Sequence, residues 1–260
     1  MKDALIITKR QLLQLFRVPE VLIFSTIQPV MFVLLFRYVF GGAINTPGVD
    51  YVQLLMPGIF VQTVAFTVAG TALGLAEDMQ KGLIDRFRSL PIARSAVVVG
   101  RTLGDATLNV VVLVVMAITG LLVGWRPSSS LLEIMAGFLF LLIFGYAMSW
   151  MGVLVGLSVR DSRVANSVVF LFVFPMTFLS NAFAPTTGMP RPLQYVAAWN
   201  PVSTMVAGVR DLFGLEPMFG ATANSFPSQN PLVMSLIYIA LLMVIFIPLS
   251  VRKYKNVSPK

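Results

Sequence analysis

Long apolar runs alternate with short charged stretches along the whole chain. Six of these runs are close to the roughly 20 residues that a helix needs to cross the hydrocarbon core of a bilayer. They occupy residues 20–40, 57–76, 97–124, 131–159, 164–183 and 231–251. Pro29 is expected to kink the first span, and Pro57 is expected in the first turn of the second, where a proline removes no hydrogen bond. The pattern predicts an all-α polytopic membrane protein with six transmembrane helices, in a single domain over residues 1–260.

The longest polar interruption lies between the second and third predicted spans. Residues 77–101 carry five cations and three anions. A charged stretch of this length cannot lie in hydrocarbon, so it is expected in water on one face of the membrane. Within it, Gly82 permits a turn, and residues 83–90 can form two turns of helix before Pro91.

That short helix would have two different sides. Its apolar residues are Leu83, Ile84, Phe87 and Leu90, and its charged residues are Asp85, Arg86 and Arg88. An apolar face with a charged rim suits docking into a groove on a soluble partner. The same pattern is typical of an ordinary loop whose apolar face rests on lipid headgroups. The pattern alone leaves both interpretations open.

Composition and charge agree with a membrane protein. The chain is 57% hydrophobic and only 12% charged, with a mean hydropathy of +0.85, whereas soluble domains carry about a quarter charged residues. The net charge of +8 would also suit nucleic acid. However, most Lys and Arg residues lie at the two termini, in 77–101 and in 158–163, and cytoplasmic loops of membrane proteins are enriched in them. We therefore expect both termini in the cytoplasm, a location in the plasma membrane, and no nucleic-acid partner.

Two further segments have helical amphipathicity. Residues 1–17 place their basic and apolar side chains on different arcs, which predicts an interfacial helix on the cytoplasmic leaflet or, alternatively, a simple basic tail. The long outer loop, 184–230, contains apolar residues at helical spacing after Asn200-Pro201. This second helix could be re-entrant, dipping into the outer leaflet, or could pack on the spans, and the pattern favours neither.

The chain contains few groups that could carry catalysis. It has no histidine and no cysteine, which excludes disulfides, thiolate chemistry and His/Cys metal sites. No phosphate-binding G-x-x-x-x-G-K-[ST] loop is present, so no cofactor is expected on this chain and any ATP must bind elsewhere. Asp105 lies four residues after Arg101, which predicts an ion pair near the membrane surface. With no series of buried acids across the membrane, coupling to an ion gradient has little support.

Three groups of residues resemble one known family. The first comprises Glu77-Asp78, Lys81-Gly82-Leu83-Ile84-Asp85, Ser89-Leu90-Pro91-Ile92-Ala93-Arg94 and Gly100-Arg101. The second comprises Pro175 and the run Leu179-Ser180-Asn181-Ala182-Phe183-Ala184-Pro185. The third comprises Trp199-Asn200-Pro201 and Arg210-Asp211-Leu212-Phe213-Gly214. These resemble the ABC-2 type permeases, the membrane subunits of ATP-driven exporters, although that family usually has Gly where this chain has Asn181.

The resemblance implies a half-transporter, most similar to bacterial drug-resistance permeases of the daunorubicin-exporter kind. Such a subunit is not an enzyme: it faces a second permease subunit, as a homodimer or heterodimer, above soluble ABC ATPase subunits that bind ATP and Mg. Residues 77–96 would be a cytoplasmic coupling segment that docks on the ATPase. The contact residues would be Glu77, Asp78, Gly82, Leu83, Ile84, Asp85, Arg86, Phe87, Leu90, Pro91 and Arg94. Asn200, Pro201 and Arg210 would belong to an outer element.

A substrate path is expected to need aromatic and small polar side chains from the second and fifth spans. The candidates are Phe60, Phe66, Thr67, Phe174, Thr177, Phe178 and Asn181, and each could instead be a core or lipid-facing residue. The motifs Gly70-x-x-x-Gly74 and Gly152-x-x-x-Gly156 permit close helix packing, either within the subunit or across a dimer. We expect an ATP-driven exporter of a hydrophobic or amphiphilic compound such as a drug, an antibiotic or a lipid-like molecule. A gradient-driven secondary transporter or channel is the alternative.

Overall fold

The computed structural model describes residues 19–42, 44, 48–83, 94–159, 161–215 and 225–256 of the chain. The predicted interfacial helix at 1–17 lies outside these residues. So does most of the predicted docking helix, because residues 84–93 are not among those described.

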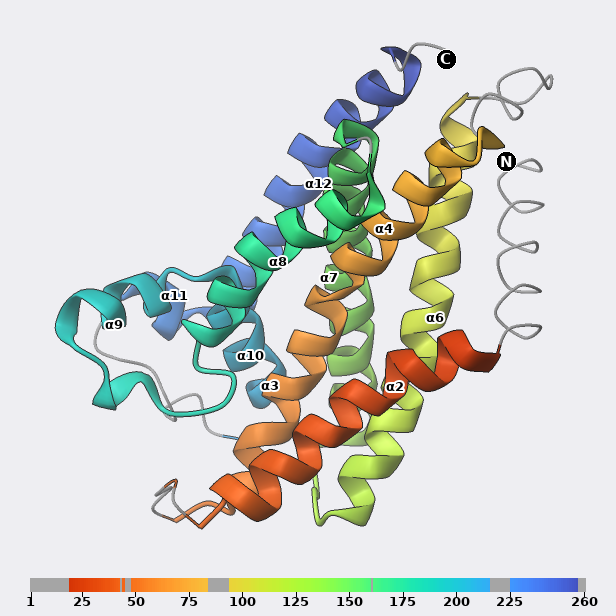
Figure 1. The fold of residues 1–260 in the computed structure, drawn as a ribbon. Coiled ribbons are helices and arrows are strands. Elements are labelled where there is room, and N and C mark those ends of the chain that lie inside the picture. Colours follow the sequence, from red (N-terminus) through yellow and green to blue (C-terminus); the bar gives the residue numbers. More distant parts are fainter. Residues whose placement is uncertain are drawn as a thin grey trace.

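Every regular element in the described residues is a helix (Figure 1). The elements are α2 (Pro19–Leu34), its π-helical continuation η1 (Leu35–Phe40), α3 (Tyr51–Ala65), α4 (Thr67–Gln80), α6 (Arg94–Leu122), α7 (Leu131–Ser158), α8 (Ser162–Phe178), the 3₁₀ turn η2 (Thr186–Gly188), α9 (Arg191–Ala198), α10 (Pro201–Leu212), α11 (Phe226–Gln229) and α12 (Pro231–Asn256). The all-α class is confirmed for this part of the chain.

Among the residues that the structure describes, four helical stretches are long and apolar enough to cross a membrane. They are Tyr51–Gln80, which joins α3 and α4, and Val97–Leu122, Leu131–Ser158 and Pro231–Asn256. Two shorter apolar helices, Ser25–Phe40 and Ser162–Phe178, occupy the positions of the first and fifth predicted spans. A helix is therefore found at each of the six predicted spans, and four of these helices are long enough to cross a membrane.

The predicted role of Pro57 is wrong. Asp50 caps the helix instead, with its carboxylate accepting from the backbone N–H of Val52 at 3.3 Å, so α3 begins six residues earlier and contains Pro57 in its interior. Because proline has no N–H, the carbonyl of Gln53, four residues before it, loses its helical donor. The residues from Tyr51 to Met56 are apolar except for Gln53, so the apolar run itself extends back to the observed start of the helix.

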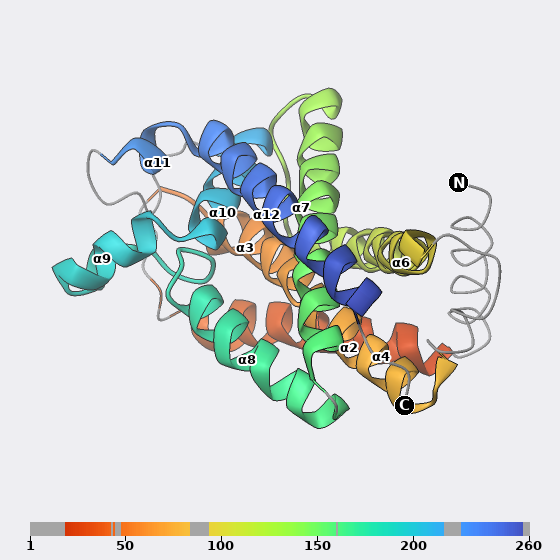
Figure 2. The same ribbon diagram turned by 90° about the horizontal axis from the view of Figure 1, so that it is seen from above.

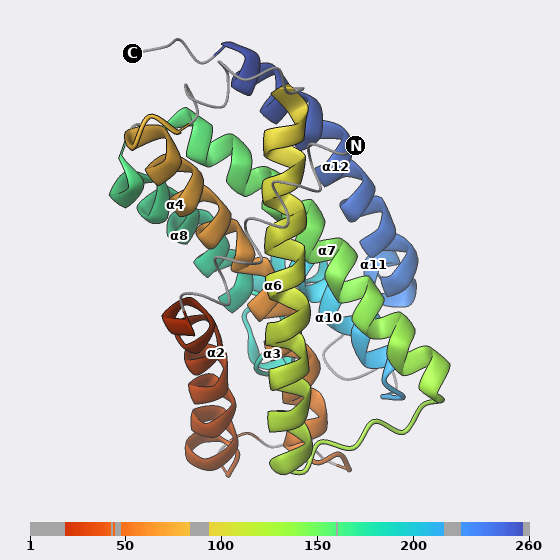
Figure 3. The same ribbon diagram turned by 90° about the vertical axis from the view of Figure 1, so that its right-hand side faces the viewer.

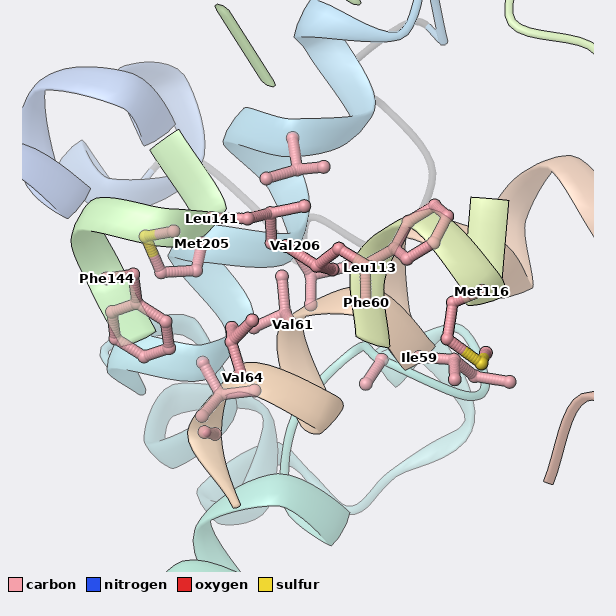
Figure 4. Packing of buried hydrophobic residues seen from close by; sticks show 14 of the residues in the cluster. Ile59, Phe60, Val61, Val64, Leu113, Met116, Leu141, Phe144, Met205 and Val206 are labelled. Carbon is pink, nitrogen blue, oxygen red and sulfur yellow. The ribbon is translucent and has the colours of Figure 1, made fainter. Parts of the chain in front are cut away.

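The α3–α4 stretch lies at the centre of the bundle. Helix α7 packs along α4, α8 covers another side of α4, and α10 and α7 contact α3 (Figures 1 and 2). Helix α2 lies beside α3 and α6 (Figure 3). Figure 4 shows the core that results, with side chains contributed by α3, α6, α7 and α10. Its labelled members are Ile59, Phe60, Val61, Val64, Leu113, Met116, Leu141, Phe144, Met205 and Val206.

The helix expected after Asn200-Pro201 is α10. Eight of its twelve residues are buried, and it packs on α3, α7 and α12. The helix expected here is therefore present, and it packs on the spanning helices.

Two glycines of α7 bring it close to α4. A Cβ built on Gly152 would lie 2.6 Å from the carbonyl oxygen of Val68, and one on Gly156 would lie 2.7 Å from that of Ala72. Both obstacles are backbone atoms, so no side-chain rotation can relieve them. The second small-residue motif therefore packs helices within the subunit.

We predict that Gly152→Ala destabilises the protein because the added methyl group must push α7 away from α4. Overpacking of this kind costs about 1–3 kcal/mol, and the thermal melting temperature of the detergent-purified protein should fall by several degrees. Gly70→Ala is the matched control, since a Cβ at Gly70 meets no heavy atom within 4 Å. Equal melting temperatures for the two variants would contradict the packing described.

Candidate transport site

A cavity of about 190 Å³ lies between α2, α3, α4 and α6. Each of these helices contributes polar side chains to its wall: Gln28, Gln62, Thr67, Thr71, Asp105 and Asn109. Phe32, Phe66 and Leu108 form part of its apolar wall. The cavity thus offers both hydrogen-bonding groups and aromatic surface.

The polar groups of the cavity pair across α4 and α6. Thr71 Oγ1 donates to Asp105 Oδ2 at 2.7 Å, and Thr67 Oγ1 donates to Asn109 Oδ1 at 2.8 Å. Residues four apart on a helix lie one above the other, so the spacing 67/71 on α4 matches the spacing 105/109 on α6. Two parallel hydrogen bonds therefore join these helices along the cavity wall.

A cluster of charged side chains lies between these hydrogen bonds and the coupling segment (residues 77–96). Arg101 lies 3.3 Å from Asp78 Oδ2 and 3.6 Å from Asp105 Oδ1, and its side chain is 15% exposed. The predicted pairing of Arg101 with Asp105 is confirmed, whereas its contact with Asp78 on α4 was not predicted. Gly74 provides the space, because a Cβ there would collide with the guanidinium. The first small-residue motif thus admits a charged side chain.

The first end of the coupling segment contacts this cluster through Asp78. Glu77 forms an ion pair with Lys81 at 3.4 Å. Gly82 has a φ of +66°, which is the left-handed conformation that favours glycine, so the predicted turn is confirmed. Leu83 follows the turn, and Arg94 begins α6. Of the other predicted contact residues, Ile84, Asp85, Arg86, Phe87, Leu90 and Pro91 lie outside the described residues.

The residues predicted for a substrate path separate into three places. Phe66 and Thr67 line the cavity. Phe174 and Phe178 stack on each other on α8, with ring centroids 4.3 Å apart, and are 45% and 38% exposed. Thr177, on the same helix, is buried and donates to the carbonyl of Val173.

Phe60 and Asn181 are buried away from this cavity. The Phe60 ring is fully buried and lies 5.3 Å from Trp125, 5.5 Å from Phe138 and 6.1 Å from Phe213, in edge-to-face contacts. Asn181 follows α8 and its backbone carbonyl accepts from Arg210. Helical spacing alone does not distinguish a core aromatic from one that lines a cavity.

The predicted outer element contains two buried polar residues, Asn200 and Arg210. Asn200 caps α10 by accepting from the N–H of Val202 at 2.9 Å, and Pro201 occupies the first turn. Arg210, placed by the sequence in an outer loop, is 1% exposed. Its Nη2 donates to the carbonyls of Leu54 at 2.8 Å and Asn181 at 2.9 Å. Arg210 thereby connects α10 to α3 and to the segment that follows α8, and we call these contacts the Arg210 latch.

The charge of Arg210 is preserved by these contacts. Burial lowers the pKa of its guanidinium to about 9, and the proximity of Tyr51 opposes that shift. The group is therefore still protonated at neutral pH. Backbone carbonyls supply the hydrogen-bond acceptors that the buried guanidinium needs.

Sequence reasoning missed several cavity residues, namely Gln28, Gln62, Thr71 and Asn109. A signal was present for two pairs, since Thr67/Thr71 and Asp105/Asn109 each put polar groups four residues apart inside an apolar run. The sequence around these pairs does not show which other helices they would contact.

Comparison with known proteins agrees with this architecture. The profile of the ABC-2 type transporter family matches residues 3–213, so the chain belongs to that family, whose members are membrane permease subunits of ABC transporters. The chain is 33% identical to the daunorubicin resistance ABC transporter permease protein DrrB1 of Streptomyces coeruleorubidus, over 92% of this chain and 81% of that protein. It is 27% identical to the putative transport permease ycf38 of Cyanophora paradoxa, over 82% and 74%. It is 25% identical to the probable doxorubicin resistance ABC transporter permease protein DrrC of Mycobacterium tuberculosis, over 90% and 81%.

We predict that Arg210→Met destabilises the protein, because the carbonyls of Leu54 and Asn181 lose their donor while buried. Each unsatisfied group costs about 1–3 kcal/mol. The yield of monodisperse protein in detergent and its melting temperature should both fall. Arg191→Met, at an exposed position on α9, should change neither, and a similar loss in both variants would contradict the latch.

Proposed function

We propose that this chain is the permease subunit of an ABC exporter that carries a hydrophobic or amphiphilic compound, such as a drug, an antibiotic or a lipid-like molecule, out of the cell. The energy comes from ATP and Mg bound by a separate soluble ATPase, and a second permease subunit completes the membrane part. The observation that carries the proposal is the position of Arg101, which joins α4 to α6 through Asp78 between the ends of the coupling segment and the polar cavity. The similarity to drug-resistance permeases supports the class of cargo.

The proposed mechanism is mechanical. ATP binding closes the ATPase pair and displaces the coupling segment. Helices α4 and α6 then move together, because the Arg101 ion pairs and two Thr-mediated hydrogen bonds join them. Since α4 and α6 are two walls of the cavity, this motion changes the shape of the cavity and its access to either side of the membrane.

The proposal places both termini and the coupling segment in the cytoplasm of a cell bounded by the plasma membrane. The enrichment of Lys and Arg at these places supports that orientation. The Arg210 latch would then lie toward the outer side, at the opposite end of the α3–α4 stretch from Arg101.

One observation favours a second candidate function, a gradient-driven transporter. Asp105 is an acid inside a spanning helix beside a cavity, and such residues often carry protons. The two functions differ in their energy source: the second needs no ATPase and responds to a proton gradient.

We predict that Leu83→Asp, or the charge reversal Asp85→Arg with Arg86→Glu, abolishes the stimulation of ATP hydrolysis by substrate in the permease–ATPase complex. A charge at Leu83 would have to be buried in the docking groove, so the stimulated rate should fall by at least about tenfold, equivalent to about 1.4 kcal/mol. The variants should still insert into the membrane, because the changes lie outside the spans.

Lys253→Glu is the matched control, since Lys253 is an exposed cation near the end of α12. It should retain the stimulated rate. Full stimulation in the Leu83 and Asp85/Arg86 variants would contradict the docking role of the coupling segment.

A further inference from the structure

The charged side chain of the cavity already has its partners. Asp105 accepts a hydrogen bond from Thr71 at 2.7 Å and lies 3.6 Å from Arg101. Among the described residues, no other ionisable side chain lines the cavity. The described wall therefore favours an uncharged ligand over a charged one.

The hydroxyl groups of the three threonines in the wall are also paired. Thr63 Oγ1 donates to the carbonyl of Ile59 at 2.7 Å, and the other two threonines donate to side chains of α6. The amide nitrogen of Asn109 has no acceptor among the described residues, but it is fully buried, and a Cβ on Gly145 of α7 would lie 2.8 Å from it. That nitrogen therefore lies against α7 and is not accessible from the cavity.

Gln62 on α3 differs from these residues, because its side chain is buried and has no partner. It is 5% exposed and lines the cavity. Its amide forms no hydrogen bond with any residue that the structure describes, although buried side-chain amides are normally paired. The amide atoms are not fully enclosed by protein atoms, so they face the space of the cavity. A partner for this amide must come from the contents of the cavity.

An aromatic ring lies beside the Gln62 amide. The backbone N–H of Phe66 donates to the carbonyl of Gln62 at 3.0 Å, so the two residues are one helical turn apart and their side chains lie on the same face of the helix. The Phe66 ring makes an edge-to-face contact with Phe170 of α8, with ring centroids 5.5 Å apart. Phe32 of α2 adds a second ring to the wall. This part of the cavity thus combines a neutral hydrogen-bonding group with aromatic surface.

We propose that the cavity binds an uncharged aromatic compound that carries a hydroxyl group, and that Gln62 recognises the hydroxyl. The ring system of the compound lies against Phe66 and Phe32. A hydroxyl is both a donor and an acceptor, so it can pair with the oxygen or the nitrogen of the amide, whereas a ketone or an ether can pair only with the nitrogen. This assignment rests on the proposed exporter function and names the chemical class of its cargo.

The proposal predicts that Gln62 sets the selectivity of the cavity. A site that pairs a buried polar group with a substrate hydroxyl rejects the analogue that lacks the hydroxyl, because its own group is then left unpaired. Two radiolabelled probes test this, 1-naphthalenemethanol and 1-methylnaphthalene, which are similar in size and differ in one hydroxyl group. Equilibrium dialysis measures their binding to the permease–ATPase complex in nanodiscs without ATP, with binding to protein-free nanodiscs subtracted.

The measured quantity is the selectivity, defined as the affinity for the alcohol divided by the affinity for the hydrocarbon. Gln62→Met replaces the amide with an apolar side chain of similar length and should lower the selectivity at least about fivefold, as expected for the loss of one hydrogen bond. Its affinity for the hydrocarbon should be unchanged or higher. Thr63→Val is the matched control, since Thr63 is the neighbouring cavity residue and its hydroxyl is already paired. This variant should keep the selectivity of the wild type.

The stability of Gln62→Met is a second readout. Because the amide has no partner among the described residues, its replacement by an apolar group should not lower the melting temperature of the complex in the absence of probe. A variant that does not fold, or that melts several degrees below the wild type, would show that the amide has a structural role and would overturn the proposal.

Equal selectivity in the wild type and Gln62→Met also overturns the proposal, and this is the result expected if only ordered water occupies the site. Absence of binding of either probe by the wild type overturns it as well. Neither result contradicts the exporter function, because binding is measured without ATP. Failure of the exporter function would instead appear as absence of ATP-driven transport of a fluorescent amphiphile in sealed vesicles, with the selectivity of binding still present.

Discussion

A charged side chain buried in an apolar bundle must have partners, and two arginines of this chain meet that requirement in different ways. Arg101 faces the carboxylates of Asp78 and Asp105, whereas Arg210 donates to backbone carbonyls of Leu54 and Asn181. Both arginines bind the α3–α4 stretch, one near each end. The central stretch of the bundle is thereby tied to α6 at one end and to α10 at the other.

This arrangement relates the coupling segment to the cavity. Between the two arginines, the cavity wall is made of Thr side chains on α4 that donate to Asp105 and Asn109 on α6. These two hydrogen bonds join two walls of the cavity. In the proposed mechanism, a force applied at the ends of α4 and α6 would reach the cavity through these contacts.

The sequence predicted the features that depend on local patterns. Apolar runs located the helices, the spacing of Arg101 and Asp105 predicted their ion pair, and Gly82 predicted a turn. Contacts between distant segments could not be predicted in this way. Thr71 and Asp105 are 34 residues apart, and their meeting depends on how α4 and α6 are rotated about their axes. The burial of Arg210 could not be predicted for the same reason, because its acceptors are backbone carbonyls that carry no signal in the sequence.

We propose that this subunit draws its energy from another chain through the coupling segment. The direct test is transport of a fluorescent amphiphile into sealed inside-out proteoliposomes that contain the permease alone or with its ATPase, with and without ATP. The account predicts accumulation only when both proteins and ATP are present, at a rate unaffected by collapse of the proton gradient. Accumulation by the permease alone, driven by a proton gradient, would contradict it.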